Sequence, residues 1–260
     1  MRTTFLGVVH LGPCPSAARG RPDFEPVLAA ALKDAEALAS GGVDGILVEN
    51  FGDAPFHKGS VEDPVPPDVP AALAVVARAV RVATGLPVGV NCLRNDGVGA
   101  LGAAAVAGAR WVRVNVLTGA MVTDQGLIGG EAARVAGYRK QLGVDVVLLA
   151  DLLVKHAVPL AAPSPVTAAR DLAARSGADG LILTGGRTGE PADLELLDSV
   201  RAAVPGFPVW IGSGVDPESA GVLRGRCAGV IVGTSLKVGG VVTHPVDPAR
   251  VAALRRALGD

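Results

Sequence analysis

Glutamate, aspartate, asparagine and arginine side chains follow the apolar segments of this sequence, at the point where several of those segments end. Glu49 and Asp151 each come directly after a run of apolar residues. Loss of water raises the pKa of a carboxyl group toward neutrality, which suits it for proton transfer. We therefore interpret Glu49 and Asp151 as candidate acid–base residues. An ion pair of Glu49 with Arg113 or Lys155 is the structural alternative.

Amide and basic side chains at the same kind of position suggest how a substrate would be held. Asn91 and Asn115 occupy matching places on neighbouring apolar segments. They would either orient substrate hydroxyl or carbonyl oxygens or satisfy each other. Lys155 and Arg113 would stabilise negative charge, and Lys155 is also a candidate Schiff-base nucleophile. The alternative for Lys155 is that it begins a solvated loop.

His10 and Arg94 also lie where apolar segments end, and with Arg113 they are expected to contact the substrate. We assign no metal ligands, because the spacing of the His, Cys, Asp and Glu residues carries no metal signature. A divalent cation such as Mg²⁺ would bind only if the fold brings Glu49, Asp151 and His10 together.

Two glycine-rich segments, 209–215 and 230–235, each begin as an apolar strand in the last third of the sequence. In a barrel of alternating strands and helices, the turns after the seventh and eighth strands commonly form a phosphate site. Glycines let backbone N–H groups approach phosphate oxygens, and hydroxyl groups add donors. The expected phosphate-binding residues are Gly212, Ser213, Gly214, Gly233, Thr234 and Ser235, assisted by Gly185 and Gly186 after the preceding strand. The alternative is that 212–214 is only a tight turn.

Strand-like apolar segments alternate with alanine-rich segments of helical spacing along the whole chain. The predicted strands are 4–11, 43–51, 87–93, 111–117, 145–153, 180–184, 208–211 and 230–232. The predicted helices are 26–40, 70–84, 98–107, 131–141, 166–176, 193–204, 217–223 and 248–258. Eight such alternations in 260 residues predict an α/β fold, a single (β/α)8 TIM-barrel domain over residues 1–260.

Two connections, 52–70 and 118–130, are too long for routine turns of such a barrel. Both follow a predicted strand, so they are expected on the catalytic face. Long irregular loops in compact domains are often lids or binding loops. The alternative is that they form an oligomer contact.

The composition excludes several classes of function. The formal net charge is −1 and no basic stripe is present, so we expect no nucleic-acid partner. No apolar run reaches the length of a membrane span, and the start of the chain shows no cleavable leader, so a cytoplasmic protein is expected. Three scattered cysteines argue against a disulfide framework and structural zinc. Alanine-rich outer helices favour a homo-oligomer.

Several motifs, in order and over nearly the whole chain, resemble the BtpA/SgcQ family. They are 10–13 (HLGP), 49–53 (ENFGD), 91–96 (NCLRND), 111–120 (WVRVNVLTGA), 123–126 (TDQG), 151–157 (DLLVKHA), 184–185 (TG) and 212–215 (GSGV). The resemblance implies a TIM barrel of the ribulose-phosphate-binding type. It also implies a phosphate site at 212–215 and 233–235. The names attached to the family are a photosystem I accumulation factor and a member of a sugar-uptake operon.

The leading hypothesis is an enzyme that acts on a small phosphorylated sugar or ribosyl compound, with isomerase, epimerase or lyase chemistry. Binding of the phosphate would position the reacting end over the polar strand exits. One alternative is hydrolysis or transfer at a ribosyl bond, where a carboxylate steadies an oxocarbenium-like centre. A second alternative is a non-catalytic assembly or regulatory factor, like the photosystem I factor of the family.

Overall fold

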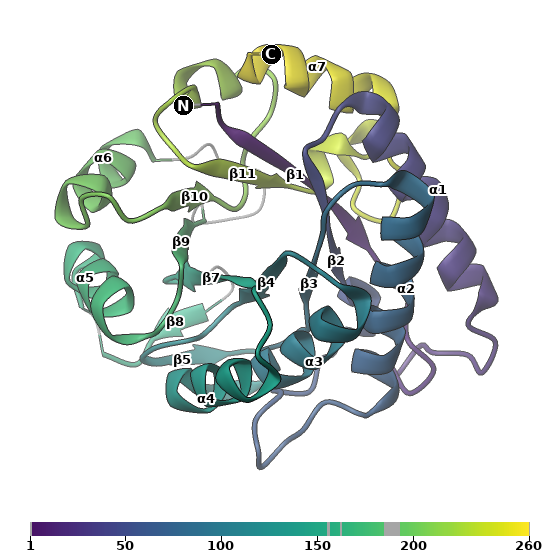
Figure 1. The fold of residues 1–260 in the computed structure, drawn as a ribbon, viewed down its shortest axis with the longest axis horizontal. Helices are drawn as coiled ribbons and strands as arrows, with labels where there is room; N and C mark the ends of the chain where they lie inside the picture. Colours follow the sequence, from purple (N-terminus) through teal and green to yellow (C-terminus); the bar gives the residue numbers. More distant parts are fainter. Residues whose placement is uncertain (1, 155–156, 162, 185–192, 260) are drawn as a thin grey trace.

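A closed barrel of eight parallel strands forms the centre of the protein, as the sequence predicts (Figure 1). The computed structural model describes residues 2–154, 157–161, 163–184 and 193–259. Around the barrel the strands follow the order β1-β11-β10-β9-β7-β4-β3-β2. Their bounds are β1 Thr4–His10, β2 Gly45–Glu49, β3 Val88–Asn91, β4 Trp111–Val114, β7 Val147–Leu152, β9 Gly180–Leu183, β10 Val209–Ile211 and β11 Gly229–Val232. The expectation of a (β/α)8 fold is therefore confirmed.

Helices surround the strands on the outside of the barrel (Figure 1). They are α1 Glu25–Gly41, α2 Asp68–Thr84, α3 Gly97–Ala107, α4 Ala132–Leu142, α5 Pro165–Arg175, α6 Leu194–Ala203 and α7 Pro248–Leu258. No helix within the described part of the chain is long and apolar enough to cross a membrane.

The predicted helix at 217–223 is wrong. Only a short 3-10 turn, Ala220–Leu223, forms there between β10 and β11. The chain turns again at Gly225, which has a φ of 66°, a left-handed conformation that favours glycine. Too few residues therefore remain between Pro217 and this turn for a stable α-helix.

Two apolar layers hold the barrel together. Inside it lie Leu6, Val8, Leu47, Trp111, Leu149, Ile182, Trp210 and Ile231. A larger cluster fills the space between the strands and the helices. Because the strands are covered on both sides, they read as continuous apolar runs in the sequence.

Strand register brings the polar strand exits to one level. His10 pairs with Glu49, Glu49 pairs with Asn91, and Asn91 pairs with Arg113 along neighbouring strands. These four residues come from segments far apart in the sequence. Closure of a parallel barrel is what makes them neighbours at its carboxyl-terminal end.

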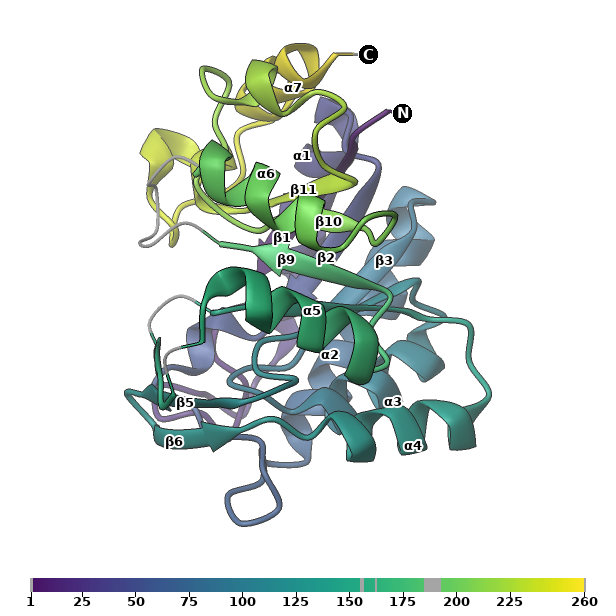
Figure 2. The same ribbon diagram turned by 90° about the vertical axis from the view of Figure 1, so that its left-hand side faces the viewer.

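The long connection 118–130 is not the irregular loop that we expected. It forms the antiparallel strands β5, Ala120–Thr123, and β6, Gly126–Gly129, which are joined in one small sheet by β8, Ala157–Pro159. Figure 2 shows β5 and β6 at the edge of the molecule, outside the barrel strands. Met121 and Ile128 pack with Val116 and Val154 in a cluster of their own, so this small sheet has an apolar inner face.

The other long connection, 52–70, carries a single 3-10 turn, Phe51–Asp53, before α2 begins at Asp68. His57 Nδ1 lies 2.7 Å from Asp63 Oδ1, and the backbone N–H of Lys58 donates to the same carboxylate. The His57 hydrogen bond, followed by that of Lys58, lowers the pKa of Asp63. These contacts order the connection locally. A role as a lid stays a prediction for both connections.

Candidate functional site

A cavity of about 310 Å³ opens at the carboxyl-terminal end of the barrel and joins the predicted phosphate loops to Glu49, one of the two predicted acid–base residues. Its walls come from the exits of β1, β2 and β4 and from the turns after β10 and β11. The lining includes His10, Glu49, Arg113, Gly212, Ser213, Gly214, Gly233, Thr234, Ser235 and Arg250. Most of the residues selected from the sequence therefore meet around one space.

His10 and Glu49 face each other in this cavity. His10 Nε2 lies 3.2 Å from Glu49 Oε1, and both side chains are about nine-tenths buried. The His10 ring packs on Phe51 with ring centroids 4.8 Å apart. Its Nδ1 is buried and has no hydrogen-bond partner among the described residues. The imidazole is thus held by Glu49 at Nε2 and by packing on Phe51.

The turn after β11 has room only for a glycine at position 233. A Cβ atom on Gly233 would lie 2.5 Å from Cε1 of His10 and 2.9 Å from its Nε2. Real Cβ atoms do not approach other atoms so closely, so the imidazole occupies the space that a side chain would need. Glycine at this position lets the turn after β11, a predicted phosphate loop, lie in direct contact with the His10–Glu49 pair.

Hydrogen bonds tie the two glycine-rich turns together. The Ser235 hydroxyl donates to the carbonyl oxygen of Val215 at 2.7 Å. Arg250, on α7, donates from Nη1 to the carbonyl oxygen of Ser235 at 2.9 Å. The Ser235 hydroxyl is therefore engaged in joining the two turns. Arg250 adds a positive charge to the cavity wall.

Asp216 also lines the cavity, beside the turn after β10. Its carboxylate accepts hydrogen bonds from the backbone N–H groups of Ser219 and Glu218 and from the Ser219 hydroxyl. The Ser219 backbone N–H, with these further donors, lowers the pKa of Asp216. The Asp216 carboxylate is therefore hydrogen-bonded within its own turn, and these bonds stabilise the loop.

A closed polar network occupies the opposite side of the barrel mouth. Arg113 donates to Asp151 from Nε at 3.3 Å and from Nη2 at 3.0 Å. Asn115 donates to the same carboxylate at 2.7 Å, and Asn91 donates to Asn115 at 3.0 Å. All four side chains are buried. The Asn91–Asn115 contact is the mutual hydrogen bond that the sequence left open as an alternative.

Charge pairing dominates the electrostatics of this network. Burial alone would lower the pKa of Arg113, but the charges of Asp151 and Glu49 and the hydrogen bond to Asp151 outweigh burial and raise it. Arg113 Nη1 lies 3.9 Å from Glu49 Oε2, a longer contact than those to Asp151. Arg113 is therefore a permanent cation, paired mainly with Asp151. It links the closed network to the cavity.

Asp151 and Asn115 line a different and smaller cavity of about 150 Å³, which also contacts Ala120, Met121 and Pro159 of the small sheet. Asp151 is thus separate from Glu49 in the structure, although the sequence suggested the same role for both. Among the described residues, no group of three His, Cys, Asp or Glu side chains is placed to hold a metal ion. A cation shared by Glu49, Asp151 and His10 has no geometric support there.

Arg94 is buried, and its burial lowers its pKa, against the opposing effects of Asp151 and Asp124. It lies outside the lining of the 310 Å³ cavity. Lys155, Gly185 and Gly186 lie outside the described residues. Their predicted roles therefore stay predictions.

Sequence reasoning missed two charged residues of the cavity, Arg250 and Asp216. Arg250 follows Pro248 at the start of the last helix. A basic residue in that position could have been selected from the sequence as a candidate phosphate contact. Asp216, which directly follows the segment 212–215, matches the pattern of an aspartate that caps a turn through its own downstream N–H groups.

The comparisons with known proteins agree with this fold. The sequence profile of the BtpA family matches residues 1–259. The chain belongs to the BtpA family. It is 47% identical over 255 residues to the photosystem I biogenesis protein BtpA of Synechocystis sp., which covers 98% of this chain and 88% of that protein. An uncharacterized protein of Pyrococcus furiosus is 43% identical over 251 residues, covering 96% of this chain and 93% of the relative.

Solved structures of similar shape are barrels of low sequence identity. N-(5′-phosphoribosyl)anthranilate isomerase from Pyrococcus furiosus superposes with a TM-score of 0.59 at 15% identity and covers 98% of each chain. Orotidine 5′-phosphate decarboxylase from Pyrococcus horikoshii gives 0.57 at 14% identity, over 99% of this chain and 100% of that one. KGPDC from Streptococcus mutans gives 0.61 at 13% identity, over 99% and 98%. At these identities the likeness shows the fold alone.

Proposed function

We propose that this BtpA-family protein is an enzyme that acts on a small phosphorylated sugar or ribosyl compound by acid–base chemistry of the isomerase, epimerase or lyase type. One observation carries the proposal. The two glycine-rich turns and the His10–Glu49 pair line the same cavity of about 310 Å³. A cavity of that size suits a sugar phosphate that extends from an anion-binding end to a proton-transfer end.

At the anion-binding end, the phosphate is held by backbone N–H groups of 212–214 and 233–235, by the Ser213 and Thr234 hydroxyls, and by Arg250. Glycines keep side chains out of the way, and Arg250 brings a guanidinium that suits phosphate geometry. Several similar folds are enzymes whose names specify phosphoribosyl or 5′-phosphate substrates, which supports this assignment. The phosphate supplies binding energy remote from the reacting atoms.

At the proton-transfer end, Glu49 takes up and releases protons, with His10 hydrogen-bonded to it. Arg113, which lies 3.9 Å from Glu49, stabilises negative charge that develops on the substrate. For Asp151 we propose a role other than the proton transfer predicted from the sequence. Since it already accepts hydrogen bonds from Arg113 and Asn115, it positions Arg113 instead of moving protons.

The main competing function is non-catalytic. A relative that is 47% identical over almost the whole chain is named as a photosystem I biogenesis protein, so a role in assembly is the second candidate. Ribosyl-bond hydrolysis or transfer is a variant of the enzymatic proposal at the same site. In that reaction Glu49 would steady an oxocarbenium-like centre.

A thermal-shift panel tests the anion site first. Phosphorylated sugars, nucleotides and free phosphate are each compared with an unphosphorylated analogue, with and without Mg²⁺. At a ligand concentration of about 100 times Kd, binding adds roughly 2.7 kcal/mol of apparent stability and raises Tm. We expect a shift that requires the phosphoryl group and disappears in Ser213→Asp. Ser199→Asp, which places the same charge on the exposed face of α6, is the matched control and should keep the shift.

Absence of a shift with every phosphorylated ligand would overturn the anion site. An equal loss in Ser199→Asp would show that added charge alone weakens binding. A shift that appears only with Mg²⁺ would support a cation at the site. Once a ligand is found, Glu49→Gln should retain binding and lose turnover, whereas an unchanged cellular phenotype in Glu49→Gln would favour the assembly function.

A further inference from the structure

Phe51 is an exposed aromatic side chain beside the candidate active site. It follows β2, two residues after Glu49, and its ring contacts the His10 ring, with centroids 4.8 Å apart and planes tilted by 54°. His10 and Glu49 both line the cavity of about 310 Å³, so Phe51 lies next to that lining. Phe51 nevertheless remains 40% exposed. The proposed function gives this ring no role.

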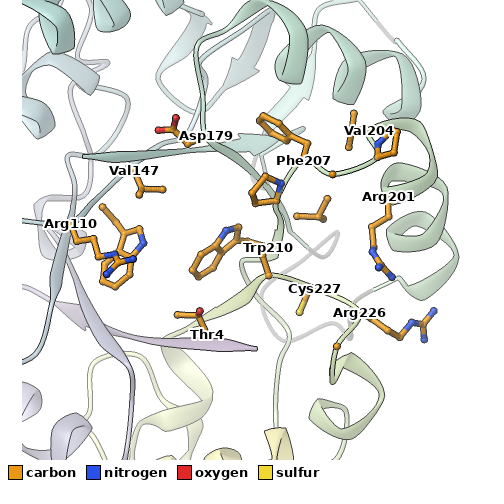
Figure 3. A pocket seen from close by; sticks show the side chains of 17 residues that line it. Thr4, Arg110, Val147, Asp179, Arg201, Val204, Phe207, Trp210, Arg226 and Cys227 are labelled. Carbon is orange, nitrogen blue, oxygen red and sulfur yellow. The ribbon is translucent and has the colours of Figure 1, made fainter. Parts of the chain in front are cut away.

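The other aromatic side chains lie elsewhere. The chain has five phenylalanines, two tryptophans and one tyrosine, all of them described, and every one except Phe51 is buried or half-buried. Those that line a separate cavity at the amino-terminal end of the barrel are Trp111, Trp210 and Phe207 (Figure 3). Those that pack between the barrel strands and the helices are Phe5, Phe24 and Tyr138. Phe56 lines a third cavity, which shares no residue with the candidate active site.

The backbone on both sides of Phe51 is held in place. The side chain of buried Asn50 accepts a hydrogen bond from the backbone N–H of Leu93 at 2.7 Å. The N–H of Gly52 donates to the carbonyl oxygen of Leu11 at 2.9 Å, and a Cβ atom on Gly52 would lie 2.7 Å from that oxygen. An exposed ring on a fixed backbone is a preorganised surface, so a ligand that covers it loses little free energy to ordering.

The strand exits form a continuous path from the predicted phosphate turns to Phe51. The order around the barrel is β10, β11, β1 and β2. Neighbouring strands lie about 5 Å apart, so the exits of β11 and β2 are separated by about 10 Å. His10 and Glu49 lie between these two ends. A phosphate, a ribose and a flat ring joined in that order would place the ribose at His10 and Glu49 and the flat ring at Phe51.

We propose that the site takes a phosphoribosyl compound with a planar aromatic group on the anomeric carbon of the ribose, and that this group stacks on Phe51. The substrate class, which rests on the proposed phosphate site, is thereby narrowed from sugar phosphates in general to ribosyl compounds. Aromatic side chains stack on the faces of flat rings irrespective of the hydrogen-bonding groups at the ring edges. A simple sugar phosphate would leave the Phe51 ring uncovered.

Isothermal titration calorimetry of the intact protein tests this with ribose 5-phosphate and with the nucleoside 5′-monophosphates AMP, GMP, CMP and UMP. Both kinds of ligand contain the phosphate and the pentose, so the ratio of their Kd values measures the contribution of the base. We expect at least one nucleotide to bind about tenfold or more tightly than ribose 5-phosphate, the advantage expected from stacking of one base.

Phe51→Ala should reduce this advantage by about tenfold, with little change in the affinity for ribose 5-phosphate. Phe51→Tyr keeps an aromatic ring and should retain the advantage. Phe56→Ala is the matched control, since Phe56 belongs to the same connection and lines a different cavity. It should retain the advantage as well.

Failure of all five ligands to bind would overturn the phosphate site, and the stacking role of Phe51 with it. Binding of ribose 5-phosphate that no nucleotide exceeds would overturn the aromatic substrate alone and would leave the phosphate site in place. An advantage that persists in Phe51→Ala would overturn the role of Phe51. Each ratio is measured within one protein, so a smaller folded fraction in a variant affects both ligands alike.

Discussion

The two sides of the barrel mouth use the same kinds of side chain in opposite ways. On the side of β1, β2, β10 and β11, Glu49 and His10 face an open cavity of about 310 Å³. On the side of β3, β4 and β7, Asp151 is enclosed by Arg113 and Asn115. Both carboxylates end apolar strands, yet among the described residues Glu49 lines a cavity of about 310 Å³ and Asp151 one of about 150 Å³.

The difference arises from what covers each side. Around Glu49 the chain provides glycines, and Gly233 in particular leaves its space to the His10 ring. Around Asp151 the chain provides donors, and the small sheet of β5, β6 and β8 contributes to the wall above it. The neighbours of a strand exit therefore determine whether its carboxylate faces a cavity or is held in a hydrogen-bonded network. The type of side chain at the exit does not decide this.

The largest expected effect comes from a substitution in the closed side of the barrel mouth, where Asp151, Arg113 and Asn115 are hydrogen-bonded to one another. Asp151→Asn replaces a carboxylate oxygen by an amide group that faces the donors of Arg113 and Asn115. It leaves a buried guanidinium without its main counter-charge, which typically costs about 3–5 kcal/mol of unfolding free energy. Chemical denaturation followed by circular dichroism measures this loss.

Asp145→Asn is the matched control for that variant. Asp145 precedes the same strand at its opposite end and is exposed, so its substitution should change stability by less than about 0.5 kcal/mol. If Asp151→Asn proved as mild as this control, the closed side would not be structural, and Asp151 would return as a candidate proton-transfer residue.

A second variant tests whether the cavity beside Glu49 and His10, the open side, requires glycine at position 233. Gly233→Ala places a methyl group 2.5 Å from Cε1 of His10. Overpacking of this kind costs about 1–3 kcal/mol, and we also expect weaker phosphate binding. His10→Ala removes the ring, so adding Gly233→Ala to it should cost much less. A double-mutant cycle by denaturation measures this coupling, and simple additivity would contradict the contact.

The barrel and the open side were predictable from the sequence because both follow from local patterns. Apolar strands covered on two faces read as continuous runs, and their alternation with helices predicts closure. Parallel closure then requires His10, Glu49 and the two glycine-rich turns to meet. No knowledge of side-chain direction is needed for that inference.

The rest depends on packing that a linear pattern does not contain. The preference of Arg113 for Asp151 over Glu49 is set by side-chain directions on three strands. The hairpin of β5 and β6 was missed because β6 begins and ends with glycine, which is rare within strands. Arg250 enters the cavity from a helix that starts well beyond the predicted phosphate loop.

A smaller effect is expected from Arg250, the cation at the proposed phosphate end of the cavity. Arg250→Gln removes a charge from the cavity wall and a hydrogen bond to the Ser235 carbonyl. Phosphate-ligand affinity should fall by about tenfold, with little change in Tm of the free protein. Arg256→Gln, exposed at the end of the same helix, should leave affinity unchanged. Equal affinity in the two variants would remove Arg250 from the site.

Only a small change in stability is expected for Glu49→Gln, and this variant decides whether the two sides truly differ. Glu49 lies 3.2 Å from His10 and only 3.9 Å from Arg113, which keeps its closer pairing with Asp151. Loss of the Glu49 charge should therefore cost no more than about 1 kcal/mol in denaturation, far less than Asp151→Asn. If the two variants were equally destabilised, both carboxylates would serve mainly to neutralise Arg113, and the open side would need another residue to move protons.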